Sequence, residues 1–369
     1  MQPDPKRHLW LFGLAIPVMA NTALFGFARA PQPLRTLCAS AGLITLHGVI
    51  PFFDQYFAQD QTEVDLEHLE DDPYYIAVVA AYLPLQYSAN LYAAALHQKK
   101  HSSLLETALL GSLLGLVNVV GINIAHELGH KKSKYQQRLA HIALLPSAYQ
   151  HFRIEHNYGH HRFVATPQDP ASAYYGESFW DFLPRTVIGG FKSAIQIEKR
   201  RLARKKLSFW HPENELLKAW AVGAAYHISM CKIFGKKWLF LQAIQISYSI
   251  ILLEAVNYME HYGLKRQRLA NGTYAPVTPQ HSWNHNSLCS NLLFYQLQRH
   301  SDHHAHPTRP FQLLKNYANV PTLPKGYGAL FSDVFMPKRW FKLIDPHLLA
   351  YYQGDLDQVH QRSDHPKHA

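Results

Sequence analysis

Nine histidines of this sequence fall into four clusters whose spacing is typical of metal ligands. Three clusters contain a pair of histidines four residues apart, which on a helix places both imidazoles on one face about one turn apart. Histidine is the commonest metal-binding side chain, and the chain has 25 of them among 369 residues. The nine clustered histidines are His126, His130, His156, His160, His161, His261, His300, His303 and His304.

The number of clustered histidines predicts a site with two metal ions. Nine imidazoles are too many for one tetrahedral or octahedral ion. They suit two ions with four or five nitrogens each and positions left open for oxygen or water. Imidazole binds zinc, copper, iron and nickel alike, so the spacing alone does not identify the metal.

Apolar stretches of about 20 residues, the length of a transmembrane helix, precede or separate these clusters. The first stretch is too long for the apolar region of a signal peptide, so we expect it to remain as a span. The predicted fold is an all-α integral membrane protein with six transmembrane helices and a cytosolic, histidine-rich helical cap. The six stretches are 9–28, 34–57, 75–96, 104–125, 216–234 and 238–256.

The basic residues give the orientation of these spans. With the N-terminus inside, 28 of the 36 Lys and Arg residues lie in inner segments, as the positive-inside rule requires. All four histidine clusters then lie at the inner membrane face. The predicted division is 1–30 for the N-terminus and first span, 31–130 for spans two to four and the first cluster, 131–215 for an inner loop with the second cluster, 216–261 for spans five and six, and 262–369 for an inner C-terminal region with the last cluster.

Charge and cysteine content narrow the possible partners. The net charge of +10 favours an anionic partner or a membrane surface, and we expect membrane lipid but no nucleic acid. The three cysteines, Cys38, Cys231 and Cys289, are isolated, which excludes a disulfide scaffold. It also means that the chain contains no paired-cysteine electron-transfer domain of its own.

Four motifs carry a resemblance to a known family: HELGHK at 126–131, EHNYGHH at 155–161, NYMEHYG at 257–263 and LQRHSDHHAHPTR at 297–309. They resemble the integral-membrane alkane 1-monooxygenases, or alkane omega-hydroxylases, within the histidine-box group that includes membrane desaturases and xylene monooxygenase. The NYMEHYG motif distinguishes the alkane hydroxylases from the desaturases. Further similar segments at 165–170, 176–178 and 281–284 extend the resemblance over most of residues 48–355.

The resemblance implies a non-haem diiron enzyme of the bacterial inner membrane, with its active site on the cytoplasmic side. It implies hydroxylation of the terminal methyl of medium-chain n-alkanes to 1-alkanols by dioxygen, with all nine histidines as ligands of two iron ions and no further catalytic side chain. Electrons would come from rubredoxin, itself reduced by an NAD(P)H-dependent rubredoxin reductase. The main alternative keeps the diiron chemistry but acts on an alkylaromatic methyl, a fatty acyl chain or a terpene. Less favoured alternatives are a zinc peptidase and a metal transporter.

Several other residues are predicted to support this site. Carboxylates often accept the second ring N–H of a ligand histidine, and the candidates are Glu127, Glu155, Asp169, Glu260 and Asp302, together with His281. Leu46, at mid-membrane on the second span, is the candidate substrate-binding side chain that sets the alkane length. Basic inner residues would bind either an acidic rubredoxin or lipid headgroups: Lys131, Lys132, Lys134, Arg200, Arg201, Arg204, Lys205 and Lys206.

Overall fold

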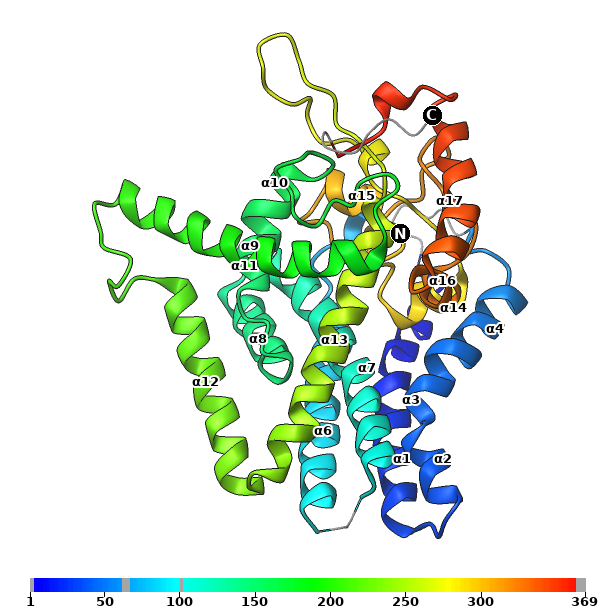
Figure 1. The fold of residues 1–369 in the computed structure, drawn as a ribbon, viewed down its shortest axis with the longest axis vertical. Coiled ribbons are helices and arrows are strands. Elements are labelled where there is room, and N and C mark those ends of the chain that lie inside the picture. The colour runs from blue at the N-terminus through cyan, green and yellow to red at the C-terminus, as the bar shows by residue number, and fades with distance from the viewer. Residues whose placement is uncertain (1–2, 62–66, 100–101, 363–369) are drawn as a thin grey trace.

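The structure, a computed structural model, is built from helices. It describes residues 3–61, 67–99 and 102–362, and in those residues it contains helices and three isolated β-bridges but no β-strand. Long helices stand side by side, and shorter helices and loops cover one end of them as a cap (Figure 1). Both ends of the described chain lie toward this cap. The predicted all-α fold is confirmed.

Three helices are long and apolar enough to cross a membrane. They match the first, fourth and sixth predicted spans: Leu9–Arg29, made of η1 (Leu9–Leu14) and α1 (Ala15–Arg29), α7 (Leu104–Gly129) and α13 (Lys237–His261). A capping box between Ser103 and Glu106 starts α7. At 1.5 Å per residue its 26 residues span roughly 39 Å, so its last turn reaches the cap.

The predicted count of six spans is not confirmed among the described residues. The second predicted span is interrupted at Ser40 and contains a π-helical turn, and the third is divided at Ala81. The fifth is one helix, but Lys218 and Lys232 lower its hydropathy. The elements concerned are α2 (Leu34–Ala39), α3 (Ala41–Ile44), η2 (Thr45–Val49) and α4 (Ile50–Tyr56), then α5 (Pro73–Ala80) and α6 (Tyr82–Lys99), and α12 (Glu215–Phe234).

Polar side chains inside the bundle bond to one another. Asn118 of α7 exchanges hydrogen bonds with Asn90 of α6 at 3.0 and 3.1 Å, and it accepts a third from Gln86 at 3.1 Å. The side chain of Gln245 on α13 accepts a hydrogen bond from Asn118. Such interhelical hydrogen bonds hold helices together where the surroundings are apolar.

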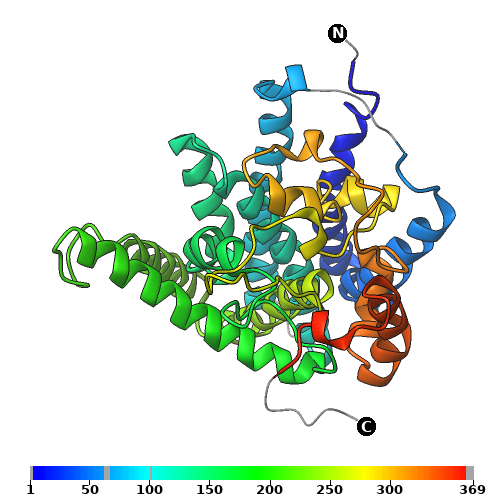
Figure 2. The same ribbon diagram turned by 90° about the horizontal axis from the view of Figure 1, so that it is seen from above.

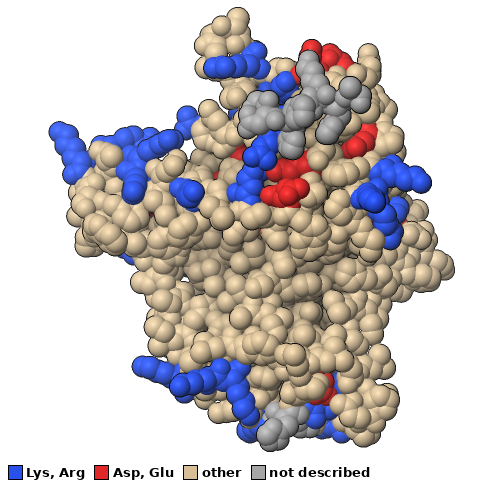
Figure 3. Space-filling model, viewed as in Figure 1, with Lys and Arg blue, Asp and Glu red and all other residues tan. Residues whose placement is uncertain are grey.

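The charged residues on the visible face of the molecule follow the same layers. Figure 3 shows Lys and Arg gathered on the cap and, in smaller number, at the opposite end, with a nearly uncharged band between them. Apolar side chains such as Phe25, Leu91 and Val222 are exposed on the helices of this region. This layering is that of a membrane protein.

The cap is assembled from short helices and one long amphipathic helix. α11 carries a basic end that projects to one side, where it leads back through a loop into α12 (Figure 2). α8 (Lys134–Leu144) and η4 (Leu145–Ser147) lead from the cap back along α7. The cap elements are η3 (Glu67–Leu69), α9 (Phe152–Glu155), η5 (His156–His160), α10 (His161–Phe163), α11 (Phe179–Arg204), η6 (Pro279–His281), α14 (Leu288–Leu293), α15 (His300–Ala305), η7 (Phe311–Leu313), α16 (Tyr327–Val334), α17 (Pro337–Tyr351) and η8 (Leu356–Gln358).

A buried ionic cluster ties the N-terminal segment to the last histidine cluster. Asp60 accepts hydrogen bonds from Lys6 at 2.6 Å and from Arg299 at 3.1 Å, and all three side chains are buried. Arg299 also donates to the carbonyl of Leu314 at 2.6 Å. The residue before His300 is thereby fixed from two sides.

Candidate metal centre

The nine clustered histidines meet where the long helices enter the cap. His126 lies in the last turn of α7, His130 follows that helix, and His261 is the last residue of α13. The other six come from η5, α10 and α15. Seven of the nine rings are buried, and His130 and His161 are half-buried. The structure therefore brings all nine predicted residues to one place.

The rings divide into two sets, here called the first group and the second group. Within each group, one candidate ligand atom per residue lies within 4.8 Å of every other. The first group is His126, His130, His156, His161 and His303, and the second group is His160, His261, His300 and His304.

The ring nitrogens of each group point at one another. Nε2 of His303 lies 2.8 Å from Nε2 of His126 and 3.1 Å from Nε2 of His161. In the second group, Nε2 of His300 and His304 are 2.9 Å apart. Two nitrogens at right angles on one ion, each about 2.1 Å from it, would lie ~3.0 Å apart. The separations fit shared coordination of a cation.

Unpartnered nitrogens give the same indication. Buried Nε2 atoms of His130, His160 and His261 have no hydrogen-bond partner among the described residues. A buried polar atom without a partner carries a free-energy cost. A bound cation would remove it by accepting the nitrogen lone pairs.

A π-helical turn determines how the second cluster is shared. η5 is π-helical over His156–His160, and this wider turn aligns residues five apart rather than four. His156 and His161 consequently face each other, with their Nε2 atoms 3.0 Å apart, in the first group. His160 joins the second group instead. The neighbouring residues His303 and His304 are divided in the same way.

Burial keeps the cap histidines in the form that binds metals. It lowers the pKa of His156, His161 and His303 well below the usual value, and the neighbouring imidazoles of the cluster lower it further. The same holds for the pKa of His300 and His304. These rings are neutral at pH 7, as metal ligation requires.

Comparison with known proteins identifies the family. The fatty acid desaturase family model matches residues 104–334, the region that contains all nine histidines. The alkane 1-monooxygenase of Acinetobacter baylyi is 46% identical over 359 residues, which cover 96% of this chain and 88% of the relative. This chain belongs to the alkane 1-monooxygenase family. Alkane 1-monooxygenase 1 of Alcanivorax borkumensis is 38% identical over 96% of the chain and 88% of its own length, and the alkane 1-monooxygenase of Pseudomonas putida is 37% identical over 96% and 89%.

In this alkane 1-monooxygenase family member, Asp169 has the expected contact with a ring of the second group. Its Oδ2 lies 2.9 Å from Nδ1 of His160, and its carboxylate also accepts the Ser172 hydroxyl at 2.6 Å. Burial lowers the pKa of His160, but the Asp169 charge more than offsets this and raises it above the usual value. The carboxylate leaves Nε2 of His160 free to face the second group.

Glu260 lies elsewhere than expected. Its Oε2 is 3.1 Å from Nε2 of His300, the nitrogen that also faces His304. The other carboxylate oxygen of Glu260 is buried and has no hydrogen-bond partner among the described residues. Glu260 therefore presents an oxygen on the inner side of the second group rather than behind a ring.

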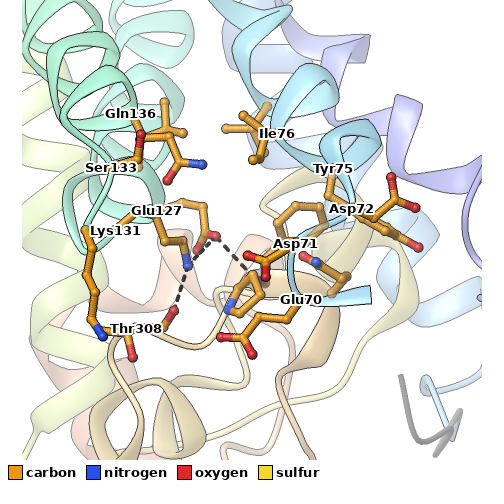
Figure 4. A pocket seen from close by; sticks show the side chains of 16 residues that line it. Glu70, Asp71, Asp72, Tyr75, Ile76, Glu127, Lys131, Ser133, Gln136 and Thr308 are labelled. Atoms are coloured by element: carbon orange, nitrogen blue, oxygen red, sulfur yellow. Dashed lines mark hydrogen bonds and ion pairs between the residues drawn. The ribbon is translucent and has the colours of Figure 1, made fainter. Parts of the chain in front are cut away.

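Glu127 and Asp302 bind cations rather than rings of the two groups. Glu127 pairs with Lys131 at 2.8 Å and faces a cavity of about 340 Å³ (Figure 4). Asp302 pairs with Arg309 at 2.6 Å and accepts the Tyr317 hydroxyl at 2.8 Å. Each is adjacent to a ligand candidate in the chain, so the helix turns it away from that ring.

Glu155 and His281, which were also predicted to support the ligand histidines, have different surroundings. A buried carboxylate oxygen of Glu155 has no hydrogen-bond partner in the part of the chain that the structure describes, and it lies beside a small cavity that His156 and His160 also line. His281 contributes its backbone carbonyl, which accepts Nδ1 of His261 at 3.3 Å. Its ring instead accepts the backbone N–H of Thr278 at 3.0 Å.

The sequence analysis missed Glu254, which lines the same small cavity. This buried carboxylate accepts hydrogen bonds from Thr186 at 2.8 Å, from Tyr149 at 3.0 Å and from Asn257 at 3.0 Å. A signal was present, because an acid inside an apolar stretch of membrane length indicates a functional site. Its position in the sixth predicted span gave that signal.

Leu46 is buried and lines an apolar cavity of about 30 Å³ between the long helices and the cap. Asn123 and Leu297 line the same cavity, each three residues before a histidine of the site. Tyr327, whose hydroxyl donates to the carbonyl of Trp283 at 3.2 Å, lines it as well. The cavity therefore adjoins the chain segments that lead into His126 and His300.

Proposed function

We propose that this protein is a membrane-bound diiron monooxygenase that converts the terminal methyl of medium-chain n-alkanes into 1-alkanols. The observation that carries the proposal is the convergence of nine imidazoles in two groups. Relatives named alkane 1-monooxygenase that match 96% of the chain support the substrate class. The reaction consumes one dioxygen, two electrons and two protons and yields the alcohol and one water.

The first and second groups would each hold one iron ion, with five and four imidazoles respectively. Iron bound there would supply the activation of dioxygen. Burial favours the neutral form of the other cap rings, described above, and Asp169 fixes the orientation and tautomer of His160. Glu260 offers an oxygen at the second group.

The apolar cavity next to Leu46 would receive the end of the alkane. Its lining is almost wholly apolar, so a hydrocarbon is favoured there over water. The cavity is too small for a whole alkane, so neighbouring side chains must move when one binds. Entry from the bilayer places the terminal methyl nearest the histidines.

Electrons would come from rubredoxin, reduced by its NAD(P)H-dependent reductase, on the cytoplasmic side of a bacterial inner membrane. Two of the basic residues predicted to bind rubredoxin are already in ion pairs, because Lys205 pairs with Glu213 at 2.7 Å and Arg201 pairs with Glu198 at 2.7 Å. Arg204 and Lys206 are exposed. Changing both to Glu should raise the rubredoxin KM and flatten its salt dependence. An unchanged salt response would assign these residues to lipid headgroups.

The test of the proposed function measures metal and product together. Cells that express the chain with a rubredoxin and its reductase are fed octane, dodecane, hexadecane and p-xylene, and the products are identified by gas chromatography. Purified protein should contain about two irons per chain. The changes His126→Ala, His160→Ala and His304→Ala should each lower bound iron and abolish turnover, whereas His347→Ala, an exposed histidine outside both groups, should change neither.

Two results would contradict the proposal. Zinc in place of iron, with no oxygen uptake, would exclude a monooxygenase. Oxidation of p-xylene with no primary alcohol from any alkane would support the monooxygenase chemistry but contradict the proposed alkane substrate.

A further inference from the structure

A groove between α8 and α12 lies apart from the metal centre. α12 stands away from the main bundle along much of its length, with α8 facing it (Figure 1). The groove between them has a volume of about 590 Å³. Its lining contains none of the nine clustered histidines, so the proposed chemistry gives it no role.

The end of the groove near the cap is strongly basic. Lys134 and Arg138 line it from α8 and Lys218 from the first turn of α12. These three side chains are exposed and form no ion pair among the described residues. The fourth cation, Arg153, is paired with the one acid of the lining, Glu215, at 2.9 Å. The groove thus presents three positive charges without matching acids.

The other end of the groove is apolar and lies beside the bundle. Ile142 lines it from the last turn of α8 and Leu145 from the start of η4, and Val222 lines it one turn beyond Lys218 on α12. Ile142 is 40% and Val222 is 56% exposed. The hydroxyl of Tyr87 on α6 donates to the carbonyl of Ile142 at 2.8 Å, which places this end against the third predicted span. Along both walls the lining therefore changes from charged to apolar with distance from the cap.

We propose that this groove binds an anionic phospholipid from the leaflet on the cap side. Its phosphate would lie among the three unpaired cations, and one acyl chain would follow the apolar wall. Basic pockets between helices at the cytoplasmic membrane surface are typical sites for anionic headgroups. The volume suits a headgroup and the upper part of a chain, whereas a free phosphate ion would leave the apolar wall uncovered.

The test compares lipid binding by the full-length protein and two charge variants. Native mass spectrometry from detergent measures retention of dioleoyl phosphatidylglycerol and of dioleoyl phosphatidylcholine. The parent should retain about one phosphatidylglycerol. Each basic residue near the surface strengthens binding roughly fivefold, so the double change Arg138→Gln, Lys218→Gln should weaken it roughly thirtyfold. The control Arg200→Gln, Arg204→Gln removes two exposed charges from α11, outside the groove, and should retain the lipid like the parent.

A second variant tests the apolar wall. Val222→Asp introduces a charge where the acyl chain would lie, at an exposed position, and should also reduce phosphatidylglycerol retention while leaving metal content unchanged. Equal retention of phosphatidylcholine, undiminished binding by the groove variants, or displacement of the lipid by excess inorganic phosphate would each overturn the proposal. None of these measurements depends on alkane hydroxylation, so the two proposals fail separately.

Discussion

Replacing Asp169 by Asn would test whether the carboxylate behind His160 strengthens the second metal position. The two side chains are joined at 2.9 Å, and both are almost completely buried. Asn has nearly the same size as Asp and keeps an oxygen that can accept from Nδ1. The change therefore removes the charge while leaving the packing of the site intact.

The expected effect follows from the strength of that hydrogen bond. A hydrogen bond to a charged group contributes about 1.5 to 3 kcal/mol, against about 1 kcal/mol for a neutral pair. If the charged hydrogen bond becomes a neutral one, the lost free energy weakens metal binding by a few-fold to about thirtyfold. Carboxylates behind ligand histidines typically contribute 10-fold to 100-fold. We therefore expect iron affinity of the second position to fall roughly tenfold or more, with a matching loss of activity at limiting iron.

Iron affinity is measured by chelator competition, and activity by the rate of 1-octanol formation. Asp302→Asn is the matched control, because Asp302 is also fully buried and lies on a ligand-bearing helix but pairs with Arg309. It should destabilise the protein by about 3 kcal/mol without changing the iron affinity of the folded fraction. Unchanged iron affinity in Asp169→Asn, or an equal loss in Asp302→Asn, would refute the reasoning.

Three further predictions concern the cavity, the cap and the metals. Leu46→Ala removes three carbons beside the cavity, so the ratio of dodecanol to octanol formed should rise, by roughly fourfold for each further alkane methylene that the enlarged cavity accommodates. Leu113→Ala, also fully buried but outside that lining, should leave the product ratio unchanged. Burial raises the pKa of Asp345 to about 6, although the Tyr262 hydroxyl opposes the shift. Ionised Asp345 therefore destabilises the fold above that pH. Asp345→Asn should raise Tm at pH 7.5 but hardly at pH 4. A change in Tm of the same size at both pH values would refute this prediction. Chelation should abolish activity, iron(II) should restore it, and zinc should not; activity that survives complete metal removal would exclude a metal enzyme.

The histidines and the fold class could be predicted from sequence because their signals are local. Each cluster stands at the end of an apolar stretch or on a short cap helix, and the rings at 126 and 130 lie one turn apart, as their spacing indicates. Asp169 was also predictable, since its motif follows the second cluster closely. These inferences need only helix geometry and the preference of imidazole for metals.

The sharing of rings between the groups was not predictable in this way. Spacing of four residues would place His156 and His160 together, but the π-helical turn joins His156 to His161. Wider turns of this kind are energetically unfavourable alone and form only where tertiary packing favours them. The position of Glu260 depends likewise on α15, which approaches from a distant part of the chain. Glu127 instead pairs with Lys131, only four residues further along.

The interruption of the predicted spans has a similar origin. Average hydropathy over 34–57 does not register the break at Ser40, because one residue changes the average little. In the third span, Gln86 and Asn90 reduce hydropathy, but the amide nitrogens of both donate to Asn118 on α7. Only the packed bundle reveals that these polar groups have partners.

The division of the rings also bears on biosynthesis. Four of the five rings of the first group occur by residue 161, whereas two of the four in the second group, His300 and His304, lie near the end of the chain. At a synthesis rate of about 5 to 20 residues per second, the interval between residues 161 and 304 lasts roughly 7 to 30 seconds. A nascent chain thus offers a nearly complete first position while the second is still being translated, so scarce iron would populate the two positions in that order.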